Sequence, residues 1–66
     1  MKRYALKQAD EVKGIVEADN IDDALDAFFP AALVDVDHDG ATPSRLEVRT
    51  LNPHREGDLY VIEELP

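Results

Sequence analysis

Apolar and polar residues alternate along the first part of the chain, which is the pattern of half-buried β-strands. In residues 3–8 (RYALKQ), Tyr4 and Leu6 fall on one face and basic residues fall on the other. After a short turn, the β-rich run at 12–18 (VKGIVEA) predicts a second strand, so that the two runs form a hairpin. Gly14 interrupts the second run and indicates a bulge or a place of close backbone approach.

The periodicity changes to that of an amphipathic helix in ADNIDDALDAFFP, residues 18–30. The apolar residues recur at i, i+3, i+4 and i+7, namely Ile21, Ala24, Leu25 and Phe28. Asp19 or Asn20 can accept hydrogen bonds from the free N–H groups of the first turn, and Pro30 should end the helix near Phe28. We expect the apolar stripe to dock on a sheet while the aspartates of the helix point away from it.

Strand patterns return in the second half of the chain. Residues 33–37 (LVDVD) predict a third strand, and 45–51 (RLEVRTL) alternates with Leu46 and Val48 facing inward. Residues 58–65 (DLYVIEEL) predict a last strand, with its paired glutamates in an exposed tail. The order β-β-α-(β)-β-β predicts a single α+β domain of 66 residues, one helix packed on an antiparallel sheet of four or five strands.

Phe29 has two interpretations. The helical period places Phe28 in the core stripe and turns Phe29 about 100° away from it. The favoured interpretation is a satellite core contact with the connector at 31–34. The alternative is an exposed apolar anchor in the middle of an acidic surface, as in the hot spots of protein interfaces.

The size and composition limit what the protein can be. A domain of this length buries only about 60% of the surface of its unfolded chain, so a bound partner or a homodimer would add stability. The chain has no cysteine, which excludes a disulfide or a thiolate zinc site. It also has neither an apolar run of about 18 residues nor the apolar core of a secretory signal. We therefore expect a cytoplasmic protein, monomeric or homodimeric, without membrane contact.

Charge is distributed unevenly along the chain. Fifteen acidic and seven basic residues give a net charge of −8. No basic residue lies between Lys13 and Arg45, and this segment, the acidic block, holds Glu17, Asp19, Asp22, Asp23, Asp26, Asp35, Asp37 and Asp39. Such a one-sign segment repels nucleic acid and attracts basic surfaces.

Three interpretations of the acidic block are open. The first is general solubility or adaptation to high salt, in a structural or dimerising domain. The second is an anionic decoy that occupies the positively charged groove of a nucleic-acid-binding protein, through the same Lys and Arg side chains that neutralise phosphates. The third is a metal site.

The metal interpretation rests on DVDHDGATPSRLE, residues 35–47, which begins like an EF-hand loop. Glu47 stands one residue beyond the position of the bidentate glutamate, and the flanking segments read as strands instead of helices. A calcium site would use the side chains of Asp35, Asp37, Asp39 and Glu47. The commoner explanation is a hairpin loop in which Gly40 supplies a positive φ and the acids are solvated.

Catalytic signatures are missing from the sequence. His38 and His54 do not have the spacing of a zinc pair, and Ser44 is not in the context of a nucleophile elbow. The three glycines form no phosphate-binding loop. We therefore expect a non-enzymatic protein without a cofactor, calcium being the alternative.

The run GIVEADNIDDALDAFF, residues 14–29, resembles a unit of small phage-encoded proteins that include some anti-CRISPR proteins. The resemblance implies a non-enzymatic inhibitor that binds a CRISPR surveillance complex, in some cases by presenting carboxylates where target DNA would sit. For a phage-encoded protein it also implies the host cytoplasm. No binding residue is carried over, because those proteins share no common motif.

The preferred hypothesis is an acidic protein-interaction module, most concretely a DNA-mimicking inhibitor. Its expected partner is a basic nucleic-acid-binding protein or complex, and not nucleic acid itself. The residues expected to contact that partner are Glu17, Asp19, Asp22, Asp23, Asp26, Phe29, Asp35, Asp37 and Asp39.

Overall fold

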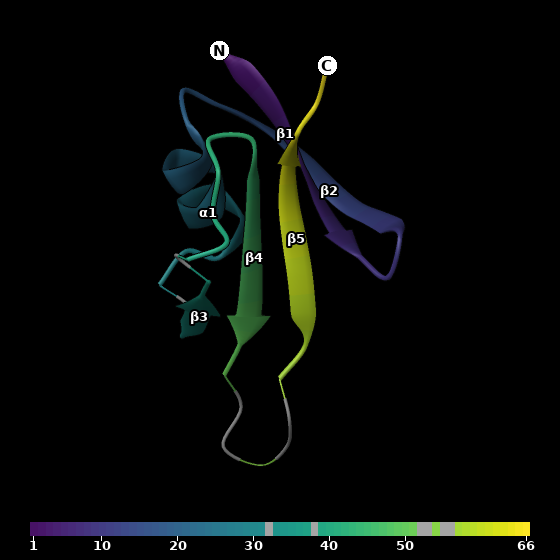
Figure 1. Cartoon of the computed structure of the whole chain (residues 1–66), viewed down its shortest axis with the longest axis vertical. Helices are drawn as coiled ribbons and strands as arrows, with labels where there is room; N and C mark the ends of the chain where they lie inside the picture. The colour runs from purple at the N-terminus through teal and green to yellow at the C-terminus, as the bar shows by residue number, and fades with distance from the viewer. Residues whose placement is uncertain (32, 38, 52–53, 55–56) are drawn as a thin grey trace.

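The computed structural model describes residues 1–31, 33–37, 39–51, 54 and 57–66, so the expectation for His38 lies outside the described residues. Within these ranges the elements are, in chain order, β1 (Lys2–Gln8), β2 (Glu11–Ala18), α1 (Ile21–Phe28), β3 (Val34–Val36), β4 (Arg45–Thr50) and β5 (Leu59–Glu64). This is the predicted α+β fold, and the third strand is present (Figure 1).

The strands form one antiparallel sheet in the order β2-β1-β5-β4-β3. The first and last strands pair near the centre of the sheet, so both chain ends lie at the same end of the molecule (Figure 1). Helix α1 connects β2 at one edge of the sheet with β3 at the other edge. It therefore crosses one face, which we call the covered face; the opposite face is called the open face.

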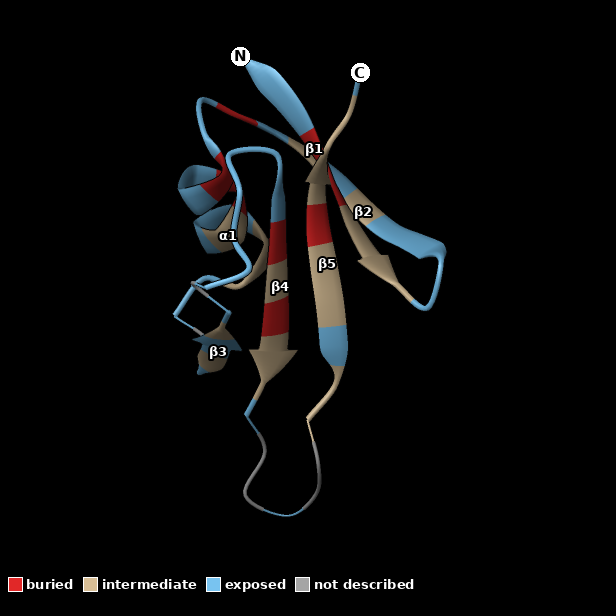
Figure 2. Cartoon of the chain, in the orientation of Figure 1, coloured by how far each residue is buried: buried red, intermediate tan, exposed pale blue. Residues whose placement is uncertain are grey.

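The hydrophobic core lies between α1 and the covered face. Leu46 and Val48 are 2% and 0% exposed, as their inward alternation predicts. Tyr4, Ala18, Ile21, Ala24 and Ile62 complete the buried cluster. Figure 2 shows these buried positions on the central strands and on the side of α1 that faces them. The apolar stripe of the helix therefore docks on the sheet as predicted.

The boundaries of α1 follow from its caps. The side-chain oxygen of Asn20 accepts a hydrogen bond from the backbone N–H of Asp23 at 2.9 Å, so Asn20 is the N-cap residue, one of the two that the sequence offered. The helix ends at Phe28, two residues before Pro30, as predicted. The N–H of Phe29 then donates to the carbonyl of Leu25 at 2.9 Å.

Phe29 is half-buried and packed against the core, which agrees with the favoured interpretation of a satellite core contact and not with an exposed apolar anchor. Its ring lies 5.5 Å from that of Tyr60, with an angle of 60° between the planes. The side chain packs against the core cluster beneath the helix end. Its ring contact is thus with β5.

The prediction for Gly14 is confirmed, and the prediction for Gly40 is not. The register of β1 and β2 shifts next to Gly14, which confirms the bulge, and a Cβ at Gly14 would lie 3.3 Å from the ring of Phe28. Positive φ angles occur at Ala9, Asp10 and Ala31 but not at a described glycine, so the prediction for Gly40 is wrong. The N–H of Gly40 instead donates to Oδ1 of Asp37 at 3.0 Å. The side chain of Asp37 thus closes the turn onto Gly40.

Candidate functional site

The open face carries a chain of ion pairs across its central strands. Lys7 of β1 pairs with Glu63 of β5 at 3.0 Å. Arg45 of β4 lies 3.7 Å from the other carboxylate oxygen of Glu63 and 3.1 Å from Glu47. All four side chains are about a third to a half exposed, so each pair contributes little stability by itself.

The prediction of an exposed tail around Glu63 and Glu64 is wrong. Both glutamates belong to β5, and Glu64 forms a further ion pair with Lys2 at 3.4 Å. The strand continues this far because β1 pairs with it, with Tyr4 opposite Glu64. A basic strand therefore neutralises the acidic end of the chain.

The aspartates of the acidic block lie elsewhere. Asp22, Asp23 and Asp26 are exposed on the outer side of α1, and Asp19 is exposed just before the N-cap. Asp35, Asp37 and Asp39 are exposed in β3 and the turn after it. We call these seven residues the acidic edge. None of them takes part in an ion pair within the described parts of the chain.

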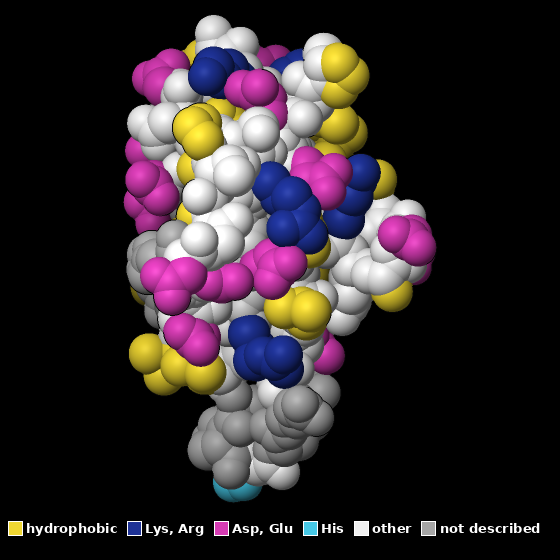
Figure 3. All heavy atoms as spheres, in the orientation of Figure 1, with side chains coloured by type: hydrophobic (Ala, Val, Ile, Leu, Met, Phe, Trp, Pro, Cys, Tyr) yellow, Lys and Arg dark blue, Asp and Glu magenta, His cyan; other side chains and the backbone are white. Residues whose placement is uncertain are grey.

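The charge separation seen along the chain is also present in space. Figure 3 shows Asp and Glu side chains along the side of the molecule at which α1 and β3 lie, and Lys and Arg side chains mainly over β1, β4 and β5. Glu17 does not join the acidic edge. It lies in β2, at the opposite edge of the sheet, in register with Arg3.

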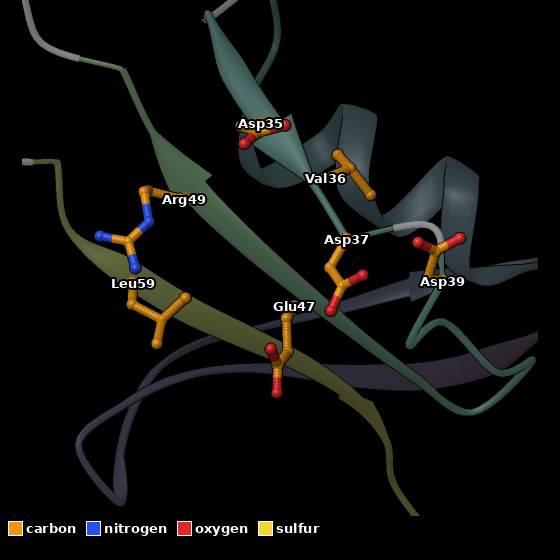
Figure 4. A pocket seen from close by; sticks show the side chains of 7 residues that line it. All are labelled: Asp35, Val36, Asp37, Asp39, Glu47, Arg49 and Leu59. Carbon is orange, nitrogen blue, oxygen red and sulfur yellow. The ribbon is translucent and has the colours of Figure 1, made fainter.

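A hollow of about 550 Å³ lies where β3 meets the open face (Figure 4). Its lining residues are Asp35, Val36, Asp37, Asp39, Glu47, Arg49 and Leu59. Strand register brings them together: Asp35 is opposite Arg49, Arg49 is opposite Leu59, and the N–H of Asp37 donates to the carbonyl of Glu47 at 3.1 Å. Four carboxylates and one guanidinium thus line the hollow, which is negatively charged.

The acids of the hollow are the ones that the calcium interpretation names. Among the described residues, no group of three or more His, Asp or Glu side chains is placed to hold a metal ion. Figure 4 shows the carboxylates spread around the hollow instead of converging on one point. The carboxylate of Asp37 also accepts the N–H of Gly40. The calcium site therefore stays a prediction that this arrangement does not support.

The sequence did not reveal that Arg49 and Leu59 belong with these acids. Alternation alone places Glu47 and Arg49 on one face of β4, but it gives no information on which residue of another strand lies beside them. Two further leucines extend the site. The N–H of Leu51 donates to the carbonyl of Leu33 at 3.2 Å, which continues the ladder of β3 and β4, and Leu33, Leu51 and Leu59 are 77%, 52% and 46% exposed.

No protein-family model, curated protein or solved structure matches this chain. In the described part of the chain, α1 is too short and too polar to cross a membrane.

Proposed function

We propose that this protein is a non-enzymatic interaction module that binds the basic, nucleic-acid-binding surface of a partner protein and keeps nucleic acid from it. The observation that supports the proposal is the acidic edge. Its aspartates face solvent and form no ion pair within the described ranges, while Glu47, Glu63 and Glu64 are each paired with a lysine or arginine of the fold. An unneutralised acidic surface presents to a partner the charge that a phosphate backbone presents.

The placement of the aspartates suits such a role. The aspartates of α1 lie on a capped helix, and Asp35 lies on a strand that is paired in the sheet. These segments therefore do not have to fold when a partner binds. A partner docked on the acidic edge would lie within a Debye length of these carboxylates, about 8–10 Å at 0.10–0.15 M salt. Association should therefore be fast and sensitive to ionic strength.

The test is affinity capture from lysate of the cells in which the protein is produced, at low and moderate salt. The informative variant, called the six-asparagine variant, replaces Asp22, Asp23, Asp26, Asp35, Asp37 and Asp39 with Asn. Asparagine retains the side-chain oxygen that accepts the N–H of Gly40, so the turn after β3 is preserved. A control variant, Glu11→Gln with Glu63→Gln and Glu64→Gln, removes ion-paired carboxylates instead.

We expect the wild type and the control variant to recover the same nucleic-acid-binding protein, and the six-asparagine variant to recover none. Added DNA should release the captured protein. Recovery of nothing specific by the wild type, or equal recovery by the six-asparagine variant, would assign the aspartates to solubility and contradict the proposal. A calcium titration followed by the amide resonances of residues 35–47 tests the metal alternative separately.

A further inference from the structure

The exposed leucines beside the hollow distinguish the two parts of the acidic edge. Around α1, the aspartates stand on a helix whose apolar residues are turned into the core. At the hollow, carboxylates stand next to Leu59, and the ladder of β3 and β4 continues to Leu33 and Leu51. Exposed apolar side chains rimmed by polar ones are typical of protein interaction sites.

We infer that the hollow is the specific docking site of this protein, and that it accepts a partner segment in which an arginine or lysine stands beside an apolar side chain. This inference rests on the proposed function and names the partner chemistry of one part of its surface. The cationic group would lie among the carboxylates of Asp35, Asp37 and Asp39, and the apolar side chain would cover Leu59.

Charge complementarity selects this occupant over others. Nucleic acid is repelled by the four carboxylates of the hollow, and their spread suits an extended cationic side chain better than a single ion. A second copy of this chain would bring the same acids to the site. Of the basic side chains at the hollow in that copy, Arg49 lies among the same acids, and the neighbouring Arg45 is already ion-paired.

The two parts of the acidic edge then have different tasks. The aspartates of α1 contribute long-range attraction, which raises the association rate and is screened by salt. The hollow adds desolvated contact with an apolar side chain, which slows dissociation and selects among basic partners. Sequence preference should therefore come from the hollow alone.

The test is a titration of the isotope-labelled protein with two acetylated, amidated peptides, followed by amide resonances. In one peptide a leucine stands between two arginines with serine spacers, and in the matched peptide serine replaces the leucine. We expect the leucine peptide to shift resonances of β3, β4 and Leu59 saturably, and to bind about tenfold more tightly than the serine peptide. Both peptides should shift α1 only weakly.

Two variants with similar exposure make the test specific. Leu59→Thr should abolish the preference for the leucine peptide, whereas Ile15→Thr should retain it, because Ile15 is 53% exposed on the open face but lies in β2, at the edge remote from β3. Equal affinities for the two peptides, equal shifts in α1 and the hollow, or no effect of Leu59→Thr would overturn the inference. If DNA displaces a captured partner but the two peptides bind with equal affinity, the proposed function is sustained and the docking site is rejected. Peptide docking without such a partner would sustain the docking site and reject DNA mimicry.

Discussion

Two sets of carboxylates differ in whether the fold pairs them with its own bases. In one set, Glu11, Glu47, Glu63 and Glu64 lie within 3.0–3.4 Å of a lysine or arginine. The aspartates of the acidic edge form no such pair within the described ranges. The first set therefore neutralises Lys2, Lys7, Lys13 and Arg45, and the second set is left for an external base.

The difference has an energetic consequence. Exposed ion pairs stabilise a fold by up to about 1 kcal/mol each, while like charges one helical turn apart destabilise it by a few tenths. Asp22 and Asp26 have this repulsive spacing on α1. The acidic edge thus costs folding stability that the paired glutamates partly offset, which agrees with a role in binding.

The largest expected effect is on binding affinity, which should depend on the aspartates of the acidic edge and not on the paired glutamates. The six-asparagine variant should bind a basic partner about 100-fold more weakly than the wild type, because each exposed ion pair contributes about 0.5 kcal/mol and six are lost. The triple glutamine control should bind within about twofold. Calorimetric titration at low salt measures both. Similar losses in the two variants would show that net charge, and not its location, determines affinity.

For the free energy of unfolding the order should be reversed, because the paired glutamates stabilise the fold and unpaired carboxylates do not. Glu63→Gln removes the pairs with Lys7 and Arg45 and should lower the free energy of unfolding by about 1 kcal/mol in urea denaturation. Glu17→Gln is the matched control, since Glu17 is exposed on the same sheet face and in no ion pair of the described residues. Its effect should stay within about 0.5 kcal/mol. A larger loss for Glu17→Gln would mean that the ion pairs of the open face do not distinguish these positions.

Replacing one aspartate of the acidic edge should stabilise the fold. Asp26→Lys converts the repulsion with Asp22 into an attraction, and it places a basic residue in the last turn of α1, which has none. We expect the free energy of unfolding to rise by about 0.5 kcal/mol, and about half as much for Asp26→Asn. Thermal denaturation of both variants measures the effect. If Asp26→Lys destabilised the fold, repulsion between Asp22 and Asp26 would not be what limits stability at this site.

Salt should have the smallest effect. At about 1 M NaCl the Debye length falls to about 3 Å, so repulsion within the acidic edge is screened. The wild type should gain a few tenths of a kcal/mol in stability relative to low salt, and the six-asparagine variant should gain less. Equal gains in both proteins would attribute the salt effect to a general influence on the hydrophobic core.

Local patterns predicted most of the fold. Each strand was visible as alternation, and α1 as a stripe at helical spacing with its cap and terminating proline, because these elements depend on near neighbours. Two contacts of single residues were not predictable. The ring of Phe29 contacts Tyr60 of β5, and the turn at Gly40 is closed by the side chain of Asp37; both contacts depend on the position of atoms that sequence spacing does not fix.

The candidate site was predictable in charge but not in shape. The acidic block indicated which residues lack basic neighbours in the sequence, and those of the acidic edge form no ion pair in the described parts of the fold, although Arg49 lies beside Asp35. The hollow depends on the register of β3, β4 and β5, which brings Arg49 and Leu59 beside Asp35 from distant segments. The same register brings Lys7 and Arg45 to Glu63 and explains why the expected tail is a paired strand.

The central claim is that the acidic edge and nucleic acid occupy one surface of the partner. The most direct measurement is displacement of fluorescently labelled DNA from the recovered partner, followed by polarisation while the protein is added. We predict that the wild type releases the DNA completely, more effectively at low salt, and that the six-asparagine variant does not. A ternary complex that retains the DNA, or equal release by the variant, would contradict the claim.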